Sequence, residues 1–112
     1  MEYSIKEVAK IIGAKGNELH DDAITILLTD SRTVSFPEQS LFFALKTKTN
    51  DGHKYIPELY KLRVRNFVVS EMAPEFANLT DANFLLVKDP LRALQQLAIH
   101  HRKKFDIPVI GI

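Results

Sequence analysis

Short apolar runs separated by polar and helix-like segments are the sequence feature that most limits the fold of this chain. Runs of this length and composition are typical of strands buried inside a sheet. They occur at 23–29, 41–45, 67–70, 84–87 and 107–112. Because helical patterns alternate with these runs, we expect an α/β fold, in which a small three-layer domain surrounds a mostly parallel or mixed sheet.

The segments between the strands carry recognisable signals for helix starts and stops. Ser4 and Glu7 have the spacing of a capping box, and Gly13 is placed to end the helix that follows them. Further helices are predicted over about 53–62 and 90–104, the second opened by an Asp-Pro pair. The expected order of elements therefore suits a sheet covered by helices.

Length and charge limit the class of protein further. The chain has 112 residues, with 15 Lys and Arg against 14 Asp and Glu, and no cysteine. This length fits one domain over 1–112, and the lack of cysteine excludes disulfides, cysteine zinc sites and thiol nucleophiles. The near balance of charge gives no electrostatic reason to expect binding to nucleic acid or to anionic membranes. No stretch looks like a signal peptide or a membrane span, so we expect a cytoplasmic protein.

The sequence ends within an apolar strand, at 109–112. Strands of this kind commonly lead into a functional loop in the next unit of an α/β protein. We therefore expect this sequence to be a piece of a longer protein.

Two polar loops are the candidate binding sites, at 29–32 and 46–53. Each directly follows a predicted strand, and open α/β sheets bind ligands at the carboxyl ends of their strands. Their hydroxyl, amide, carboxylate and basic groups suit a uracil edge, a ribose and a diphosphate. Composition alone favours the simpler interpretation, that both are ordinary hydrophilic turns.

Other possible sites are weaker. Residues 13–16 (GAKG) are similar to the GXXG loop with which KH domains clamp RNA, but 17–22 form a poor second helix and contribute two acids. A glycine helix stop followed by a turn explains the same residues.

His100 and His101 are adjacent on a predicted helix, so their side chains point about 100° apart and share a metal poorly. The phosphate-binding patterns GxxxxGK[ST] and GxGxxG do not occur, and we expect no catalytic residue and no metal ligand.

Three separated motifs change the balance between these interpretations. They are DSR at 30–32, LFFALK at 41–46 and DGHKYI at 51–56, followed by the apolar strand at 108–112. In this order they resemble the N-terminal domain of the Mur ligases, most closely of those that add D-alanyl-D-alanine to UDP-N-acetylmuramoyl-tripeptide. The same domain of the ligases that add the third stem residue is a close alternative. An RNA-binding module through the GAKG loop and an interaction domain with no ligand are alternatives from other classes. The sequence departs from the family at Thr47, where a glycine is common.

The resemblance implies that substrate binding and ATP binding belong to different domains of a longer protein. The N-terminal domain of such ligases holds the UDP part of the substrate, UDP-N-acetylmuramoyl-peptide. A central domain binds ATP and Mg²⁺ through a glycine-rich loop that would follow the last strand, and a C-terminal domain helps to bind the dipeptide. This chain alone would then be an inactive substrate-binding part of a peptidoglycan ligase, whose partners are the missing domains, with no nucleic acid and no membrane.

The resemblance also assigns roles to residues of the two loops. The positions expected to contact the UDP moiety are Thr29, Ser31, Lys48, Thr49 and Asn50. Those expected to shape the loops are Asp30, Arg32, Asp51, Gly52 and His53.

Overall fold

The structure, a computed structural model, describes residues 3–15, 22–29 and 36–105. Its centre is a four-stranded parallel sheet in which neighbouring strands follow one another in the chain. The strands are β3 (Ile26–Leu28), β4 (Ser40–Phe43), β5 (Asn66–Val69) and β6 (Asn83–Leu86). The strand predicted at 107–112 lies outside the described residues.

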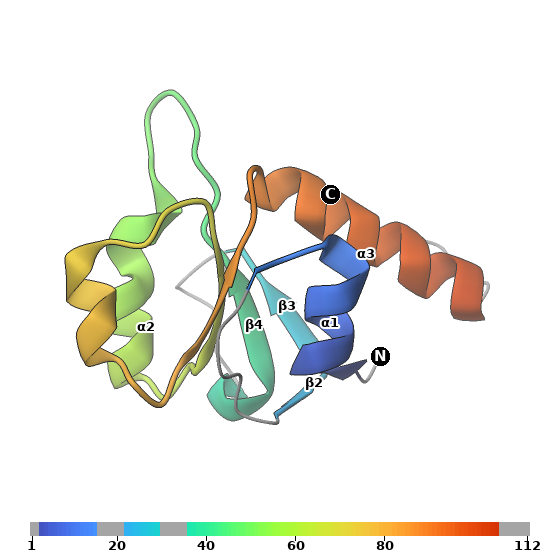
Figure 1. Cartoon of the computed structure of the whole chain (residues 1–112), viewed down its shortest axis with the longest axis horizontal. Helices are drawn as coiled ribbons and strands as arrows, with labels where there is room; N and C mark the ends of the chain where they lie inside the picture. Colours follow the sequence, from blue (N-terminus) through green and yellow to red (C-terminus); the bar gives the residue numbers. More distant parts are fainter. Residues whose placement is uncertain (1–2, 16–21, 30–35, 106–112) are drawn as a thin grey trace.

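Helices cover both faces of this sheet, as the α/β prediction requires (Figure 1). Alternate side chains of β4 point to opposite faces, so Leu41 and Phe43 pack into one core while Phe42, with Ala44 just after the strand, packs into another. The first core is shared with α1 (Ile5–Ile12) and α3 (Pro90–Phe105), and the second with α2 (Ile56–Lys61). Burial on both faces explains why the strands are continuous apolar runs rather than alternating ones.

Helix α1 begins and ends where the sequence predicts. The Ser4 hydroxyl accepts from the backbone N–H of Glu7 at 3.1 Å, and the Glu7 carboxylate accepts from the Ser4 N–H at 3.2 Å. Gly13 ends the helix in the left-handed conformation, with φ 64°. The capping box and the glycine stop are therefore both confirmed.

The predicted strand at 23–29 is wrong in detail, because the chain divides it between two sheets. β2 (Ala23–Ile24) pairs antiparallel with β1 (Tyr3–Ser4), and only β3 joins the parallel sheet. Between them, Thr25 donates its backbone N–H to the carbonyl of Gln39 at 3.0 Å. The division secures the start of α1, because the short β1 strand directly precedes that helix.

The crossover from β4 to β5 contains the second predicted helix in two parts. A 3-10 helix, η2 (Gly52–Tyr55), leads into α2, whose first turn contains a proline. Two further 3-10 helices, η1 (Pro37–Gln39) and η3 (Pro74–Asn78), have no counterpart in the prediction. At the start of α3 the Asp89 carboxylate accepts the N–H of Leu91 at 3.1 Å. No helix in the described part of the chain is long and apolar enough to cross a membrane.

Candidate functional site

The two candidate loops begin at neighbouring strands. Leu28, the last residue of β3, is paired in register with Phe42 of β4, so the carboxyl ends of these strands lie side by side. Thr29 follows β3 as an exposed bend. Asp30, Ser31 and Arg32, which the sequence assigns to the same site, lie outside the described residues. The structure therefore brings Thr29 to the same sheet edge as the loop after β4.

The loop after β4 is a tight, hydrogen-bonded turn. Lys46 and Asp51 face each other in an isolated antiparallel bridge at its base. Within the turn, the Thr47 N–H donates to the Asn50 carbonyl at 2.7 Å, and the Asn50 N–H donates to the Thr47 hydroxyl at 3.0 Å. Threonine thus stabilises this turn at the position where glycine is common among the Mur ligases. These bonds occupy Thr47 and present residues 48–50 at the tip.

The tip residues keep polar groups available for a ligand. Lys48 and Thr49 are exposed, and neither side chain has a hydrogen-bond or ion-pair partner among the described residues. The Asn50 side-chain oxygen accepts a long hydrogen bond from the Tyr55 hydroxyl, at 3.4 Å. This bond orients the Asn50 amide and leaves its NH₂ group as a donor.

Gly52 allows the returning strand of the turn to approach β4 closely. Its N–H donates to the Leu45 carbonyl at 2.8 Å. A Cβ atom at this position would lie 2.9 Å from the Leu45 nitrogen and 3.0 Å from the Ala44 Cα. Because both neighbours are backbone atoms, only glycine fits here without moving the chain.

Asp51 and His53 connect the turn to the next strand. The Asp51 carboxylate accepts from the His53 backbone N–H at 3.0 Å and lies 2.6 Å from the ring Nδ1 of the same residue. On the other side of the ring, Nε2 accepts the backbone N–H of Ser70, at the end of β5, at 3.1 Å. Because Nε2 accepts a hydrogen bond, Nδ1 is the ring nitrogen that donates, and its partner is the Asp51 carboxylate. His53 is buried, and its two ring nitrogens connect the loop after β4 to the residue that follows β5.

The Asp51 carboxyl is held in its ionised form by this arrangement. Burial opposes ionisation, but the hydrogen bonds from the His53 backbone and ring outweigh it, and the pKa of Asp51 is lowered. The nearby Lys46 ammonium adds to the effect, at 3.9 Å from the carboxylate. The site therefore keeps a negative charge at neutral pH.

Asp51, His53 and Ser70 have the order of a hydrolase triad, but their geometry does not suit a nucleophile. The Ser70 hydroxyl lies 3.5 Å from His53 Nε2, farther than the Ser70 N–H that already donates to this nitrogen. The ring nitrogen thus has no free lone pair with which to take the hydroxyl proton. We assign these three residues a structural role.

The same group offers a possible cation site, which the structure does not favour. Ligand atoms of Asp51, His53 and Glu71 lie within 4.8 Å of one another. However, the Lys46 ammonium lies 3.4 Å from the Glu71 carboxylate and 3.9 Å from the Asp51 carboxylate, so a bound cation would be repelled by a positive charge already in the cluster. Mg²⁺ also prefers oxygen ligands, and the sequence contains no GxxxxGK[ST] loop. This cluster of described residues therefore does not fit Mg²⁺, and the sequence pattern offers no loop that fits the phosphates of ATP.

A cavity lies farther along this edge, at the ends of β5 and β6. It has a volume of about 570 Å³ and includes none of the predicted site residues. Its basic lining residues are Lys15, Lys88 and Arg92. Lys88 could have been found from the sequence, because it directly follows the apolar run 84–87, as the two candidate loops follow theirs. Lys15 and Arg92 reach the cavity through tertiary packing, for which the sequence gives no signal.

Comparisons with known proteins identify the family of this chain. The Mur ligase family, catalytic domain, matches residues 23–102. The UDP-N-acetylmuramoyl-tripeptide–D-alanyl-D-alanine ligase of Synechocystis sp. (strain ATCC 27184 / PCC 6803 / Kazusa) is 36% identical over 96 residues. That alignment covers 86% of this chain and 20% of the ligase.

Solved structures show the same fold. Crystal structure I of MurF from Acinetobacter baumannii superposes with a TM-score of 0.78 at 20% identity, over 93% of this chain and 22% of that chain. The UDP-N-acetylmuramoylalanyl-D-glutamyl-2,6-diaminopimelate–D-alanyl-D-alanyl ligase of the same organism gives a TM-score of 0.80, with the same identity and coverage. This chain thus spans about a fifth of the length of its relatives. The family match over most of its residues, supported by the common fold, shows that the chain belongs to the Mur ligase family.

Proposed function

We propose that this chain binds the nucleotide end of UDP-N-acetylmuramoyl-tripeptide within a ligase that adds D-alanyl-D-alanine during peptidoglycan synthesis. The observation that carries the proposal is the sheet edge formed by the ends of β3 and β4. There, Thr29 and the base of the 46–51 turn lie at the carboxyl ends of neighbouring strands. The side chains of Thr29, Lys48 and Thr49 have no partner among the described residues. The Synechocystis relative, which is named as a ligase of this specificity, supports the choice of substrate.

The chemistry of uracil suits this edge. A uracil ring presents two carbonyl acceptors and one N–H donor, and hydroxyl and amide side chains can match all three. In our proposal Thr29 and Ser31 contact the uridine from the β3 side, while Lys48, Thr49 and Asn50 form the second wall around uracil and ribose. A site that hydrogen-bonds such groups discriminates strongly against analogues that lack them.

Ligase chemistry is assigned to residues outside this sequence. The sequence contains no glycine-rich phosphate loop, so ATP and Mg²⁺ are expected to bind in the central domain of the longer ligase, in the cytoplasm. This chain alone is then expected to neither hydrolyse ATP nor form an amide bond. The main alternative is the same role in a ligase that adds the third stem residue.

Calorimetric titration with UDP-N-acetylmuramoyl-tripeptide tests the proposal, both on this chain and on the longer ligase polypeptide expected to contain it. The informative variant is Ser31→Ala with Asn50→Ala, which removes two hydrogen-bonding groups. At about 1 kcal/mol for each bond, affinity should fall about 30-fold.

A matched control is Asn78→Ala with Gln95→Ala, because both side chains are exposed outside the site. The control should bind as the wild type does. Saturable binding by the longer polypeptide that is unchanged in the Ser31 and Asn50 variant would refute the site assignment.

A further inference from the structure

The cavity beside β6 is a second candidate binding site, separate from the loops after β3 and β4. Its wall is formed where the chain leaves α1. Gly13 turns the backbone so that Lys15 pairs with Leu86 of β6, with N–H to carbonyl distances of 3.0 Å in both directions. This pairing adds one residue beside β6, the outermost strand of the parallel sheet, and holds the backbone of Lys15 at the cavity.

Three positive charges surround the cavity from different parts of the chain. Lys15 follows α1, Lys88 follows β6, and Arg92 lies in the first turns of α3. All three side chains are exposed, and none forms an ion pair with an acidic side chain in the described part of the chain. Unpaired cations gathered around one hollow favour an anionic ligand.

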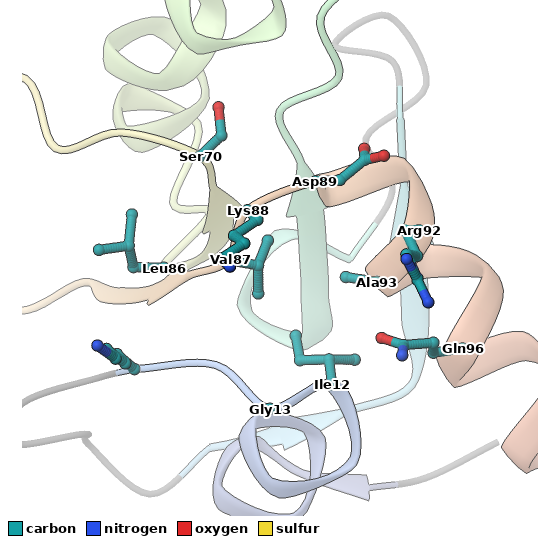
Figure 2. A pocket seen from close by; sticks show the side chains of 11 residues that line it. Ile12, Gly13, Ser70, Leu86, Val87, Lys88, Asp89, Arg92, Ala93 and Gln96 are labelled. Carbon is teal, nitrogen blue, oxygen red and sulfur yellow. The ribbon is translucent and has the colours of Figure 1, made fainter.

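The lining of the cavity contains one carboxylate, that of Asp89, and this group already accepts a hydrogen bond from the backbone. Asp89 accepts the Leu91 N–H at 3.1 Å as the cap of α3, so its charge is directed to the helix end. The lining therefore keeps an excess of positive charge. Gln96, one turn beyond Arg92 on the same helix, lies beside it and adds a neutral donor (Figure 2).

The floor of the cavity is apolar. Ile12, Val87 and Ala93 line it, and Val87 and Ala93 lie between Lys88 and Arg92 in Figure 2. An apolar floor with a few polar groups at its margin is the usual composition of a site for a small organic molecule, and about 570 Å³ is within the usual size range. A bare inorganic ion would leave this floor uncovered.

We propose that this cavity binds an organic phosphate, with the phosphate held by Lys15, Lys88 and Arg92 and the uncharged part resting on Ile12, Val87 and Ala93. A phosphate group carries up to two negative charges and three acceptor oxygens, which several cations can share. Arginine binds phosphate through two parallel hydrogen bonds, and lysine binds it as a point charge. This site does not depend on the function proposed above.

NMR titration of the ¹⁵N-labelled chain with phenyl phosphate tests the proposal, with inorganic phosphate as the comparison. We expect the amide signals of Gly13, Lys15 and Lys88 to shift. Phenyl phosphate should bind at least tenfold more tightly than inorganic phosphate, because only its ring covers the apolar floor.

The pocket variant is Lys88→Gln with Arg92→Gln, and the matched control is Lys6→Gln with Lys61→Gln. Both double variants remove two positive charges, but Lys6 and Lys61 are exposed on α1 and α2 outside the cavity. The pocket variant should bind phenyl phosphate at least tenfold more weakly, while the control stays within twofold of the wild type. The spectra themselves show whether each variant is folded.

Equal weakening in both variants, or shifts scattered over the surface, would overturn the proposal, because either result indicates non-specific attraction. Adding UDP then identifies the source of the phosphate. If UDP displaces phenyl phosphate in the wild type, the diphosphate of the UDP-linked substrate reaches this cavity. If both ligands bind together, the cavity takes a separate phosphorylated molecule.

Discussion

At the scale of single residues, two glycines of this chain are required for different reasons. Gly52 is required by space, since an added Cβ would meet the backbone of Ala44 and Leu45. Gly13 is required by conformation, since φ is 64° there and nothing lies within 4 Å of an added Cβ. The cost of the same substitution should therefore differ between the two positions.

We expect Gly13→Ala to lower the free energy of unfolding by about 1 kcal/mol, the cost of a left-handed alanine. Gly52→Ala should lower it by about 2–3 kcal/mol, because the backbone must move to admit the methyl group. Urea unfolding followed by circular dichroism measures both. Equal losses, or a larger loss at Gly13, would contradict the close backbone approach at Gly52.

A second residue-scale cluster ties the end of α2 to the turn before β6. The Tyr60 hydroxyl donates to the Asp81 carboxylate, which also accepts from Arg65 Nε at 2.9 Å. The hydrogen bond raises the pKa of Tyr60, and the same bond outweighs burial to lower the pKa of Asp81. The Arg65 guanidinium lies 3.9 Å from the centre of the Tyr60 ring, which adds a cation–π contact.

These shifts predict a pH dependence of stability. A lowered Asp81 pKa stabilises the fold above about pH 4 and loses that effect as pH falls through the folded value. A raised Tyr60 pKa stabilises the fold below about pH 10 and loses that effect as pH rises through its folded value. The difference in melting temperature between the wild type and Tyr60→Phe should thus be largest near neutral pH and shrink at both extremes. A difference that is constant from pH 3 to pH 11 would contradict the hydrogen bond.

At the scale of elements, buried amides align β5 with β6. Asn66 and Asn83 are partners in the strand register, and Asn83 donates from its side chain to the Asn66 oxygen at 2.7 Å. Asn66 in turn donates to the Asp22 carboxylate at 3.2 Å. Because a one-residue slip of register would separate two buried polar groups, this pair selects one alignment of the strands.

We expect Asn66→Ala to lower the free energy of unfolding by about 1–3 kcal/mol, because it removes a partner of a buried amide. Combining it with Asn83→Ala should cost less than the sum of the single changes, with a coupling of about 1 kcal/mol. Chemical unfolding of the wild type, both single variants and the double variant measures the coupling. Strict additivity would show that the two amides act independently.

The elements that the sequence predicts well are those specified by local signals. Ser4 and Gly13 define α1 through capping groups a few residues apart, and the apolar runs define the strands of the parallel sheet. The division of 23–29 at Thr25 could not be predicted in this way, since it depends on a hydrogen bond to Gln39 and on pairing with a two-residue strand at the other end of α1.

At the scale of the whole molecule, the site too could be predicted from the sequence only where local signals specify it. Because parallel strands end at one edge, the sequence could indicate that the loops at 29–32 and 46–53 meet there. It could not indicate that His53 accepts a hydrogen bond from Ser70, 17 residues away, or that Lys15 pairs with β6. Such contacts depend on tertiary packing, and they decide which polar groups are already occupied and which remain for a ligand.

The arrangement of the molecule therefore divides the carboxyl edge of the sheet into two regions. The loops after β3 and β4 carry Thr29, Thr49 and Asn50, with Lys48 beside them, and in our proposal these groups contact the base and the sugar. The ends of β5 and β6 present a positively charged cavity with an apolar floor. His53 joins the two regions, because it belongs to the first and bonds to Ser70, which lines the second.

Nucleotide binding at the ends of β3 and β4 can be tested by an NMR titration of the ¹⁵N-labelled chain with UDP-N-acetylmuramoyl-tripeptide, which detects even millimolar affinity. We expect the amide signals of Thr29 and of residues 46–53 to shift in a saturable way, while those of Arg65 and Asp81, at the amino ends of β5 and β6, do not. Shifts confined to the amino ends of β5 and β6, or unchanged spectra at about 10 mM ligand, corresponding to binding weaker than about −3 kcal/mol, would contradict this expectation.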